Sequence, residues 1–207
     1  MGSVMTAARS GVWMVLAACV VWGLAPMYYR YLGRVPAPEM MAHRTIWSLV
    51  FFGAMLAVQG RLAALLGLWR NPEFGRIALA SALISFNWFV FIWAVQQGHA
   101  VEAGLAYYIF PLMAVVLGVV TLGERLAPLQ GLAVGLATLG VAVLTWGLGV
   151  APWLALALAA SFAAYSRIKR GLKTAAAVTV TAEVALIAPF ALGWVIWLEV
   201  TGQGAFG

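Results

Sequence analysis

The sequence predicts an all-α membrane protein with about seven transmembrane helices, part of a ten-helix bundle made of two inverted five-helix repeats. Three observations lead to this prediction. The 207 residues are 65% hydrophobic and 9% charged, whereas a soluble domain is about 45–50% apolar and about 25% charged. The apolar residues gather in runs of about 20 residues, the length that crosses a bilayer as a helix. A weak internal repeat also joins the two ends of the chain.

The apolar runs define the expected helices in order along the chain. They cover residues 12–29, 38–58, 77–97, 101–122, 129–146, 153–167 and 178–198. The sixth run is short, and the connections are short as well. The longest connection, residues 59–76, carries three arginines and one glutamate. No connection is long enough to fold alone, so we expect no soluble domain.

Lysine and arginine are distributed unevenly over alternate connections. Connections on one side of the membrane, together with the N-terminal tail, hold nine cations: Arg9, Arg61, Arg70, Arg76, Arg125, Arg167, Lys169, Arg170 and Lys173. The opposite side has only Arg30 and Arg34, and Arg44 lies inside the second run. Cytoplasmic loops hold the excess of Lys and Arg, so we expect a cytoplasmic N-terminus. The net charge of +6 is then a topology signal, and no nucleic-acid partner is expected.

Metal, cofactor and redox chemistry find little support in the sequence. Cys19 is the single cysteine, and the two histidines, His43 and His99, are far apart. No spacing typical of a zinc site occurs, and no phosphate-binding glycine loop is present. We therefore expect no metal ion, no cofactor and no catalytic residues.

An offset of 140 residues aligns the start of the chain with its end. Trp13 then meets Trp153, and Trp22 meets Phe162. Further along, Arg30 meets Arg170 and His43 meets Glu183. Each period holds five helices, and because five is odd, the second copy enters the membrane from the opposite side, as in many secondary transporters.

The repeat divides the chain into a first five-helix unit, residues 1–147, and a partial second unit of two helices, residues 148–207. Two full periods would need roughly 280–300 residues and ten helices. Because the sequence stops at Gly207, we expect it to be a truncated or fragmentary version of such a protein.

Several local motifs resemble the RarD branch of the EamA transporters, within the drug/metabolite transporter superfamily. The resemblance runs along nearly the whole chain. It is carried by Val21-Trp22-Gly23-Leu24, Ala42-His43-Arg44 with Trp47-Ser48, Asn87-Trp88 with Phe91-Ile92, Glu102-Ala103, Tyr107, Pro111-Leu112, and Glu124-Arg125-Leu126 with Gln130. The sequence departs from the pattern of the branch at Gln97, Gly104 and Phe110.

The resemblance implies a ten-helix carrier of the bacterial inner membrane, built from two inverted halves. Some relatives export amino acids or metabolites, and the branch carries the label chloramphenicol-sensitive protein. The implied partners are the lipid bilayer, a small-molecule substrate and a possible second copy of the chain in a homodimer.

Two basic side chains near the start of the second run, His43 and Arg44, are the leading candidates for substrate binding. They lie about 8 Å below the start of the helix at 1.5 Å per residue. Arg44 could hold a substrate carboxylate while His43 shares the polar patch. In the alternative interpretation both snorkel outward or pair with Glu39 or Glu102. Glu39 and His43 are four residues apart and share a helix face.

Other candidates are polar or aromatic residues inside apolar runs. Asn87 either contacts substrate or forms a hydrogen bond to another helix. Trp88 and Trp22 either line a cavity or pack and face lipid. Tyr107 lies in the first half of the fourth run, where packing is the simpler interpretation.

The two acidic candidates lie at different depths. Glu102 begins the fourth run beside His99, where it either caps the helix or belongs to a gate. Glu183 lies inside the seventh run, in the place that the repeat gives to His43, and it is a candidate for proton coupling. Charged side chains at such depth are costly and normally face the bundle interior.

These features favour a secondary transporter of a small organic molecule, such as an amino acid, a metabolite or a drug, that works by alternating access. The alternatives are a non-transporting membrane subunit and a membrane enzyme. A seven-helix photoreceptor would need a lysine in its last helix, and the only lysines, Lys169 and Lys173, are expected in a loop.

Overall fold

The computed structural model describes residues 2–123, 126–149 and 152–206. In this part of the chain the elements are helices, and Glu124 and Arg125 lie outside it. In order they are α1 (Gly2–Tyr31), α2 (Ala37–Val58), α3 (Leu62–Leu66), the short 3₁₀ helix η1 (Gly67–Arg70), α4 (Phe74–Gln96), α5 (Ala100–Leu122), α6 (Pro128–Leu148), α7 (Trp153–Arg170) and α8 (Ala176–Thr201).

Each predicted apolar run lies in one of these helices, apart from Gln97, which directly follows α4. This confirms the all-helical membrane fold. Among the described residues, six helices are long and apolar enough to cross a membrane: α1 from Gly11 onward, α2, α4, α5, α6 and α8. The sixth predicted run forms α7, which does not reach the same apolar composition. Its last turn carries Arg167, Lys169 and Arg170, three residues that the bilayer interior disfavours.

Proline and glycine set several helix ends. Pro36 precedes α2 with an extended backbone, and Pro38 occupies its first turn, where a missing N–H group costs nothing. Gly98, with a φ of +87°, closes the short connection between α4 and α5. That left-handed conformation is costly for residues with a Cβ atom, so glycine allows the chain to reverse there.

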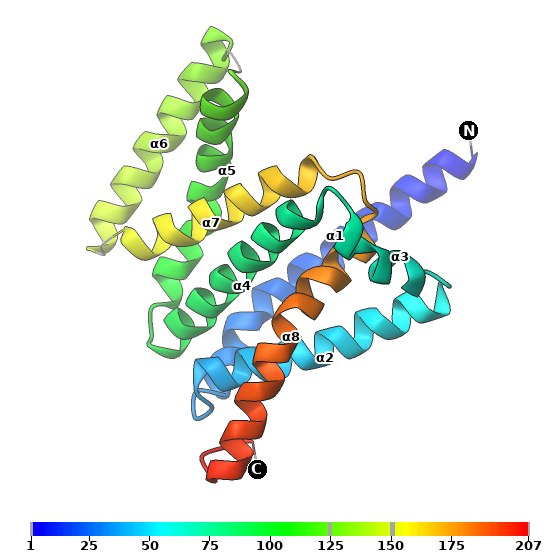
Figure 1. Cartoon of the computed structure of the whole chain (residues 1–207). Helices are drawn as coiled ribbons and strands as arrows, with labels where there is room; N and C mark the ends of the chain where they lie inside the picture. Colours follow the sequence, from blue (N-terminus) through cyan, green and yellow to red (C-terminus); the bar gives the residue numbers. More distant parts are fainter. Residues whose placement is uncertain (1, 124–125, 150–151, 207) are drawn as a thin grey trace.

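The bundle is built around α4, which contacts α1, α2, α5, α7 and α8. The most extensive helix pairings are α5 with α7 and α2 with α8. Figure 1 shows α5 crossing α7 on the left and α8 crossing α2 in the lower part of the view. Small side chains line the core shared by α4, α5 and α7, among them Ala94, Ala103 and Ala155, each fully buried. Small residues let helix backbones approach closely in membranes.

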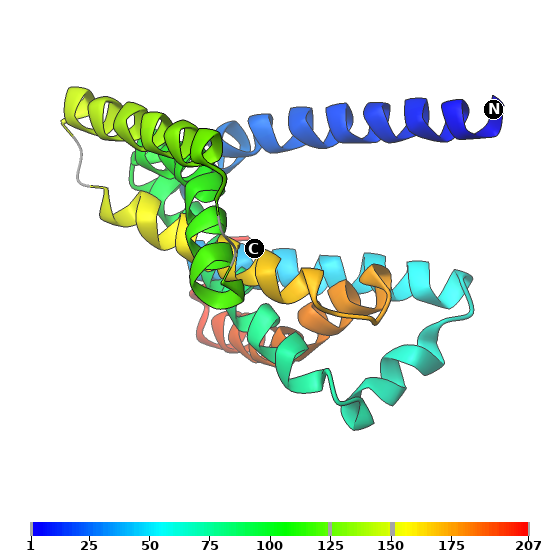
Figure 2. The same cartoon turned by 90° about the horizontal axis from the view of Figure 1, so that it is seen from above.

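Two helices make few contacts with the rest. The membrane-spanning window of α1 is 0% buried, and α6, which packs on α5, has no buried residue between Pro128 and Leu148. In Figure 2, α1 stands apart from α2 over much of its length. Their exposed side chains are apolar, for example Trp13 and Leu139, which suits contact with lipid chains.

The helices near the two ends of the chain run in opposite senses. In Figures 1 and 2, α1 runs from right to left, whereas α7 runs from left to right. The same reversal separates α2 from α8 in both views. The two segments that match at an offset of 140 residues therefore cross the bundle in opposite directions.

The alanine-lined core gives a test of close helix packing. Ala155→Leu inserts a larger side chain at a fully buried position, and overpacking of this kind costs roughly 1–3 kcal/mol. We expect a lower midpoint of thermal unfolding in detergent. Ala137→Leu on α6, where the side chain is exposed, is the matched control and should leave the midpoint unchanged; equal midpoints for the two variants would contradict this packing.

Candidate functional site

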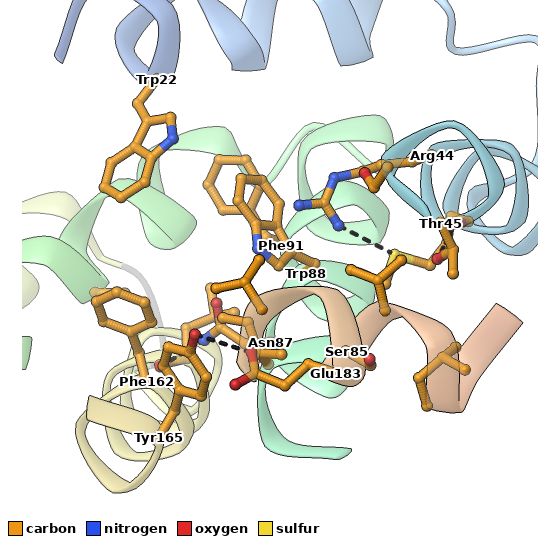
Figure 3. Close-up of a pocket in the computed structure, with 18 of the residues that line it drawn as sticks. Trp22, Arg44, Thr45, Ser85, Asn87, Trp88, Phe91, Phe162, Tyr165 and Glu183 are labelled. Carbon is orange, nitrogen blue, oxygen red and sulfur yellow. Dashed lines mark hydrogen bonds between the residues drawn. The ribbon is translucent and has the colours of Figure 1, made fainter. Parts of the chain in front are cut away.

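A cavity of about 380 Å³ lies among the helices, and Figure 3 shows its lining. Its walls come from α1, α2, α4, α5, α7 and α8. Aromatic side chains dominate: Trp22, Phe52, Trp88, Phe91, Tyr107, Phe110, Phe162 and Tyr165. The polar lining is smaller: Arg44, Thr45, Ser48, Ser85, Asn87 and Glu183. An apolar cavity with a few polar groups is typical of a small-molecule site.

Arg44 projects from α2 into this cavity. Its guanidinium carbon lies 4.0 Å from the ring centroid of Trp88, and Nη1 lies 3.8 Å from the Met41 sulfur. Figure 3 shows the guanidinium pointing toward Trp88 on α4. Among the described residues, no carboxylate approaches it within 4.0 Å. A cation over an indole ring is stabilised by the ring quadrupole, so Trp88 holds Arg44 without neutralising it.

The two glutamates that sequence analysis offered to Arg44 have other partners. Glu39, only 2% exposed, accepts hydrogen bonds from the backbone N–H groups of Ala205 and Phe206 at 2.9–3.1 Å. Glu102 lies 2.9 Å from the Nδ1 atom of His99. In the structure, neither Glu39 nor Glu102 forms an ion pair with Arg44.

Glu183 on α8 enters the cavity from the other side and is 4% exposed, as its place in an apolar run predicts. One carboxylate oxygen accepts a hydrogen bond from Lys169 Nζ at 2.6 Å. The other accepts from the Tyr165 hydroxyl at 3.1 Å. Lys169 also donates to Thr179 Oγ1 at 2.5 Å. The negative charge of Glu183 is therefore paired within the α7–α8 hairpin.

The expectation that Lys169 lies in a loop is wrong. It belongs to the last turn of α7, and its side chain is 18% exposed. The apolar run ends at residue 167, whereas the helix continues to Arg170, and Glu183 compensates the charge of Lys169. One signal could have revealed the contact: Tyr165 and Lys169 are four residues apart and so share a helix face, and a buried glutamate needs a cationic or hydroxyl partner.

Asn87 connects α4 to α7. Its side-chain nitrogen donates to the Leu158 carbonyl oxygen at 2.8 Å and to Ser161 Oγ at 2.9 Å. A second bond joins α4 to α8, from the Ser81 hydroxyl to the Glu183 backbone oxygen at 2.6 Å. These bonds correspond to the interhelix interpretation of Asn87, although the residue also lines the cavity.

The structure brings six of the eight candidate residues to one cavity: Trp22, Arg44, Asn87, Trp88, Tyr107 and Glu183. It leaves out His43 and Glu102. His43 lines a neighbouring recess and lies 4.6 Å from the ring of Phe206. Arg44, Ser48 and Phe52 line both the cavity and this recess, so these side chains separate the two spaces.

Part of the cavity wall is not among the residues predicted from the sequence. Phe162 and Tyr165 stack on α7 with ring centroids 6.0 Å apart, and Phe110 lies 4.9 Å from Phe162 across the α5–α7 contact. Phe162 was visible only as the repeat partner of Trp22. Whether Phe162 and Tyr165 face the cavity depends on the rotation of α7 about its own axis. The composition of α7 does not determine that rotation.

A polar contact joins the connections at one end of the bundle. Glu73, just before α4, accepts hydrogen bonds from the backbone N–H groups of Lys173 and Thr174 and from the Thr174 hydroxyl, at 2.7–3.0 Å. These bonds lower the pKa of Glu73 from its ordinary value, the Lys173 N–H group most strongly. Arg76 Nη1 donates to the Gly171 carbonyl oxygen at 3.0 Å. The α7–α8 connection is thereby tied to α4.

Comparison with known proteins assigns the family. The sequence profile of the EamA-like transporter family matches residues 9–146. The chain belongs to the EamA-like transporter family. This confirms the resemblance drawn from the helix motifs.

The relatives of this EamA-family member include three transporters or RarD proteins of bacteria. It is 42% identical to Protein RarD of Streptomyces exfoliatus over 96% of this chain and 63% of the relative. It is 43% identical to an uncharacterized transporter of Pseudomonas aeruginosa over 91% of this chain and 64% of that relative. It is 40% identical to Protein RarD of Escherichia coli over 88% of this chain and 62% of that relative. The chain thus spans less than two thirds of the length of these relatives. No solved structure matches it.

The buried pair of this EamA-family member can be tested by removing one partner. Lys169→Met leaves Glu183 without its cation, and an uncompensated buried charge costs roughly 3–5 kcal/mol. We expect a much lower midpoint of thermal unfolding in detergent. Adding Glu183→Gln to this variant should restore most of the loss. Lys173→Met, at an exposed side chain, should have little effect; no recovery in the double variant would contradict the pairing.

The Glu73 contact predicts a pH dependence of stability. Since its pKa is lowered in the folded protein, the ionised carboxylate stabilises the fold above the unfolded-state value, about 4.3 for Glu. That contribution disappears as the pH falls through the lower folded-state pKa. Glu73→Gln should therefore unfold at a lower temperature than the wild type at pH 7, and the difference should shrink as the pH falls below about 4.3.

Thermal unfolding in detergent across this pH range measures the difference. Glu199→Gln is the matched control, because Glu199 is exposed and its side chain makes no hydrogen bond within the described ranges. A difference between Glu73→Gln and wild type that stays constant down to pH 3 would show that the carboxylate charge is not what holds the α7–α8 connection.

Proposed function

We propose that the protein is a secondary transporter that moves a small organic molecule, such as an amino acid, a metabolite or a drug, across a bacterial inner membrane by alternating access. The observation that carries this proposal is the cavity itself. It is lined both by α1 and α2 and by α7 and α8, two helix pairs that run in opposite senses (Figures 1 and 2). Carriers built from inverted repeats place their substrate sites at such an interface.

The repeat relation extends to side chains of the cavity. Trp22 and Phe162, which correspond at the offset of 140 residues, both line it, and so do Arg44 and Val184. In the proposed mechanism, residues 1–147 and 148–207 belong to two halves that rock against each other and expose the cavity to each side in turn. Family membership and the transporter names of the relatives support this proposal.

The proposed orientation places the N-terminus in the cytoplasm. The Glu73 and Arg76 contacts to the α7–α8 connection then lie on the cytoplasmic side, where they would close that side of the cavity. Opening toward the cytoplasm would break the bonds from Lys173 and Thr174 to Glu73. A solute or proton gradient supplies the driving force, since the sequence has no nucleotide-binding loop.

Blocking the cavity tests the proposal without knowledge of the substrate. Ser85 lines the cavity, and Ser85→Trp would fill much of it. We expect cells that express the wild-type protein to differ from cells without it in the level of at least one extracellular metabolite, and cells with Ser85→Trp to lose that difference. Mass spectrometry of the culture medium measures it.

Ala137→Trp is the control, because residue 137 lies on the exposed surface of α6 and away from the cavity. It should retain the wild-type metabolite pattern at equal protein abundance. If the wild type, the Ser85 variant and cells without the protein all give the same metabolite pattern, the transporter proposal is wrong.

A further inference from the structure

The two charged residues of the cavity wall differ in how they are paired. Two charged residues line it, Arg44 on one side and Glu183 on the other. Figure 3 shows them entering from different helices, with Trp88 beside Arg44 and Tyr165 beside Glu183. Their surroundings differ in one respect that bears on the substrate: the carboxylate has a cationic partner, and the guanidinium has no carboxylate partner among the residues that the structure describes.

Glu183 is occupied by protein groups. Lys169 binds one of its oxygens at 2.6 Å and Tyr165 the other at 3.1 Å. A substrate ammonium group would have to displace Lys169 from a buried ion pair. Lys169 would then lose a partner while it remains largely buried, and an uncompensated buried charge is strongly unfavourable. The carboxylate is therefore a poor receptor for a substrate cation.

The charged guanidinium of Arg44 lines the cavity. Its neighbours include the Trp88 ring at 4.0 Å, the Met41 sulfur at 3.8 Å and the Tyr29 hydroxyl, and none of these is an acidic side chain. An arginine inside a membrane helix normally pairs with an acid or marks a substrate path. The planar guanidinium matches a carboxylate through two parallel hydrogen bonds.

We propose that the cavity selects a monocarboxylate with an aromatic or similarly flat apolar body, whose acid group binds Arg44 and whose body lies against the aromatic wall. This inference rests on the proposed transport function and names its substrate class. Lys169, Glu183 and Arg44 together give the cavity region one net positive charge, which a single carboxylate neutralises.

The walls agree with such a body. Trp88, Phe91 and Tyr107 form one aromatic surface, with ring centroids 5.9 Å and 6.5 Å apart for successive pairs. Phe162 and Tyr165 form another on α7. A cavity of about 380 Å³ falls in the range of about 300–1,000 Å³ that small-molecule sites occupy. Aromatic ligands gain from edge-to-face and stacked contacts with such rings.

A series of four compounds with the same phenyl body separates charge from shape. The compounds are 3-phenylpropionate, the neutral 3-phenylpropanamide, the cationic 3-phenylpropylamine and zwitterionic phenylalanine. Binding of each to the protein in nanodiscs is measured by calorimetry at pH 7. We expect 3-phenylpropionate to bind about tenfold or more tightly than the other three, since hydrogen bonds to charged groups outweigh neutral ones.

Substitutions at position 44 assign the preference to one side chain. Arg44→Gln should weaken binding of 3-phenylpropionate about tenfold or more and leave the binding of 3-phenylpropanamide nearly unchanged. Arg44→Lys keeps the charge and should retain part of the preference. Arg30→Gln removes an exposed cation outside the cavity and should change neither. A merely structural role of Arg44 would weaken the anion and the amide alike.

The outcomes distinguish this inference from the transport proposal. If the amide, the amine or phenylalanine binds as tightly as 3-phenylpropionate, or if none of the four binds, the monocarboxylate assignment is overturned. If Arg44→Gln keeps the preference for the anion, it is overturned as well. The transport proposal depends on the metabolite comparison with Ser85→Trp, which makes no assumption about substrate charge and can succeed when the charge series fails.

Discussion

A charged side chain among membrane helices needs a partner, because the hydrocarbon interior offers it no water. Translocon-based scales put the cost at about 2.5–3.5 kcal/mol for a charge at the centre of a helix. Lys169 and Glu183 meet this constraint with an ion pair 2.6 Å long. The pair joins α7 to α8 beside the cavity, while α7 packs on α4 and α5. Glu183 also accepts a hydrogen bond from Tyr165, which lines the cavity together with Phe162. The charge that the site presents depends on this pairing.

The helices themselves could be predicted from the sequence, since runs of about 20 apolar residues have few alternatives in lipid. Pro36 and Pro38 mark the start of α2 and Gly98 a chain reversal, which are local signals. The end of α7 was harder to place. Composition alone ends it at residue 167, whereas the helix includes Lys169, whose charge is compensated by a residue fourteen positions later.

The site could be predicted only in part, for a related reason. Arg44, Asn87 and Glu183 are conspicuous as polar residues within apolar runs, and all three line the cavity. Partners were not predictable, because they depend on contacts between distant segments. Glu39 accepts hydrogen bonds from backbone N–H groups 166 and 167 residues away. Arg44 instead lies over the ring of Trp88. His43 shares its sequence neighbourhood with Arg44 but faces the adjacent recess.

The position of the Lys169–Glu183 pair within a single helical hairpin bears on how the chain reaches the membrane. Its two members are separated by fourteen residues, on consecutive helices with a short connection between them. They can meet as soon as α7 and α8 have left the ribosome, before the rest of the bundle assembles. Because each neutralises the other, α7, which carries three basic residues in its last turn, can enter the bilayer with α8 without leaving Lys169 or Glu183 as an unpaired charge.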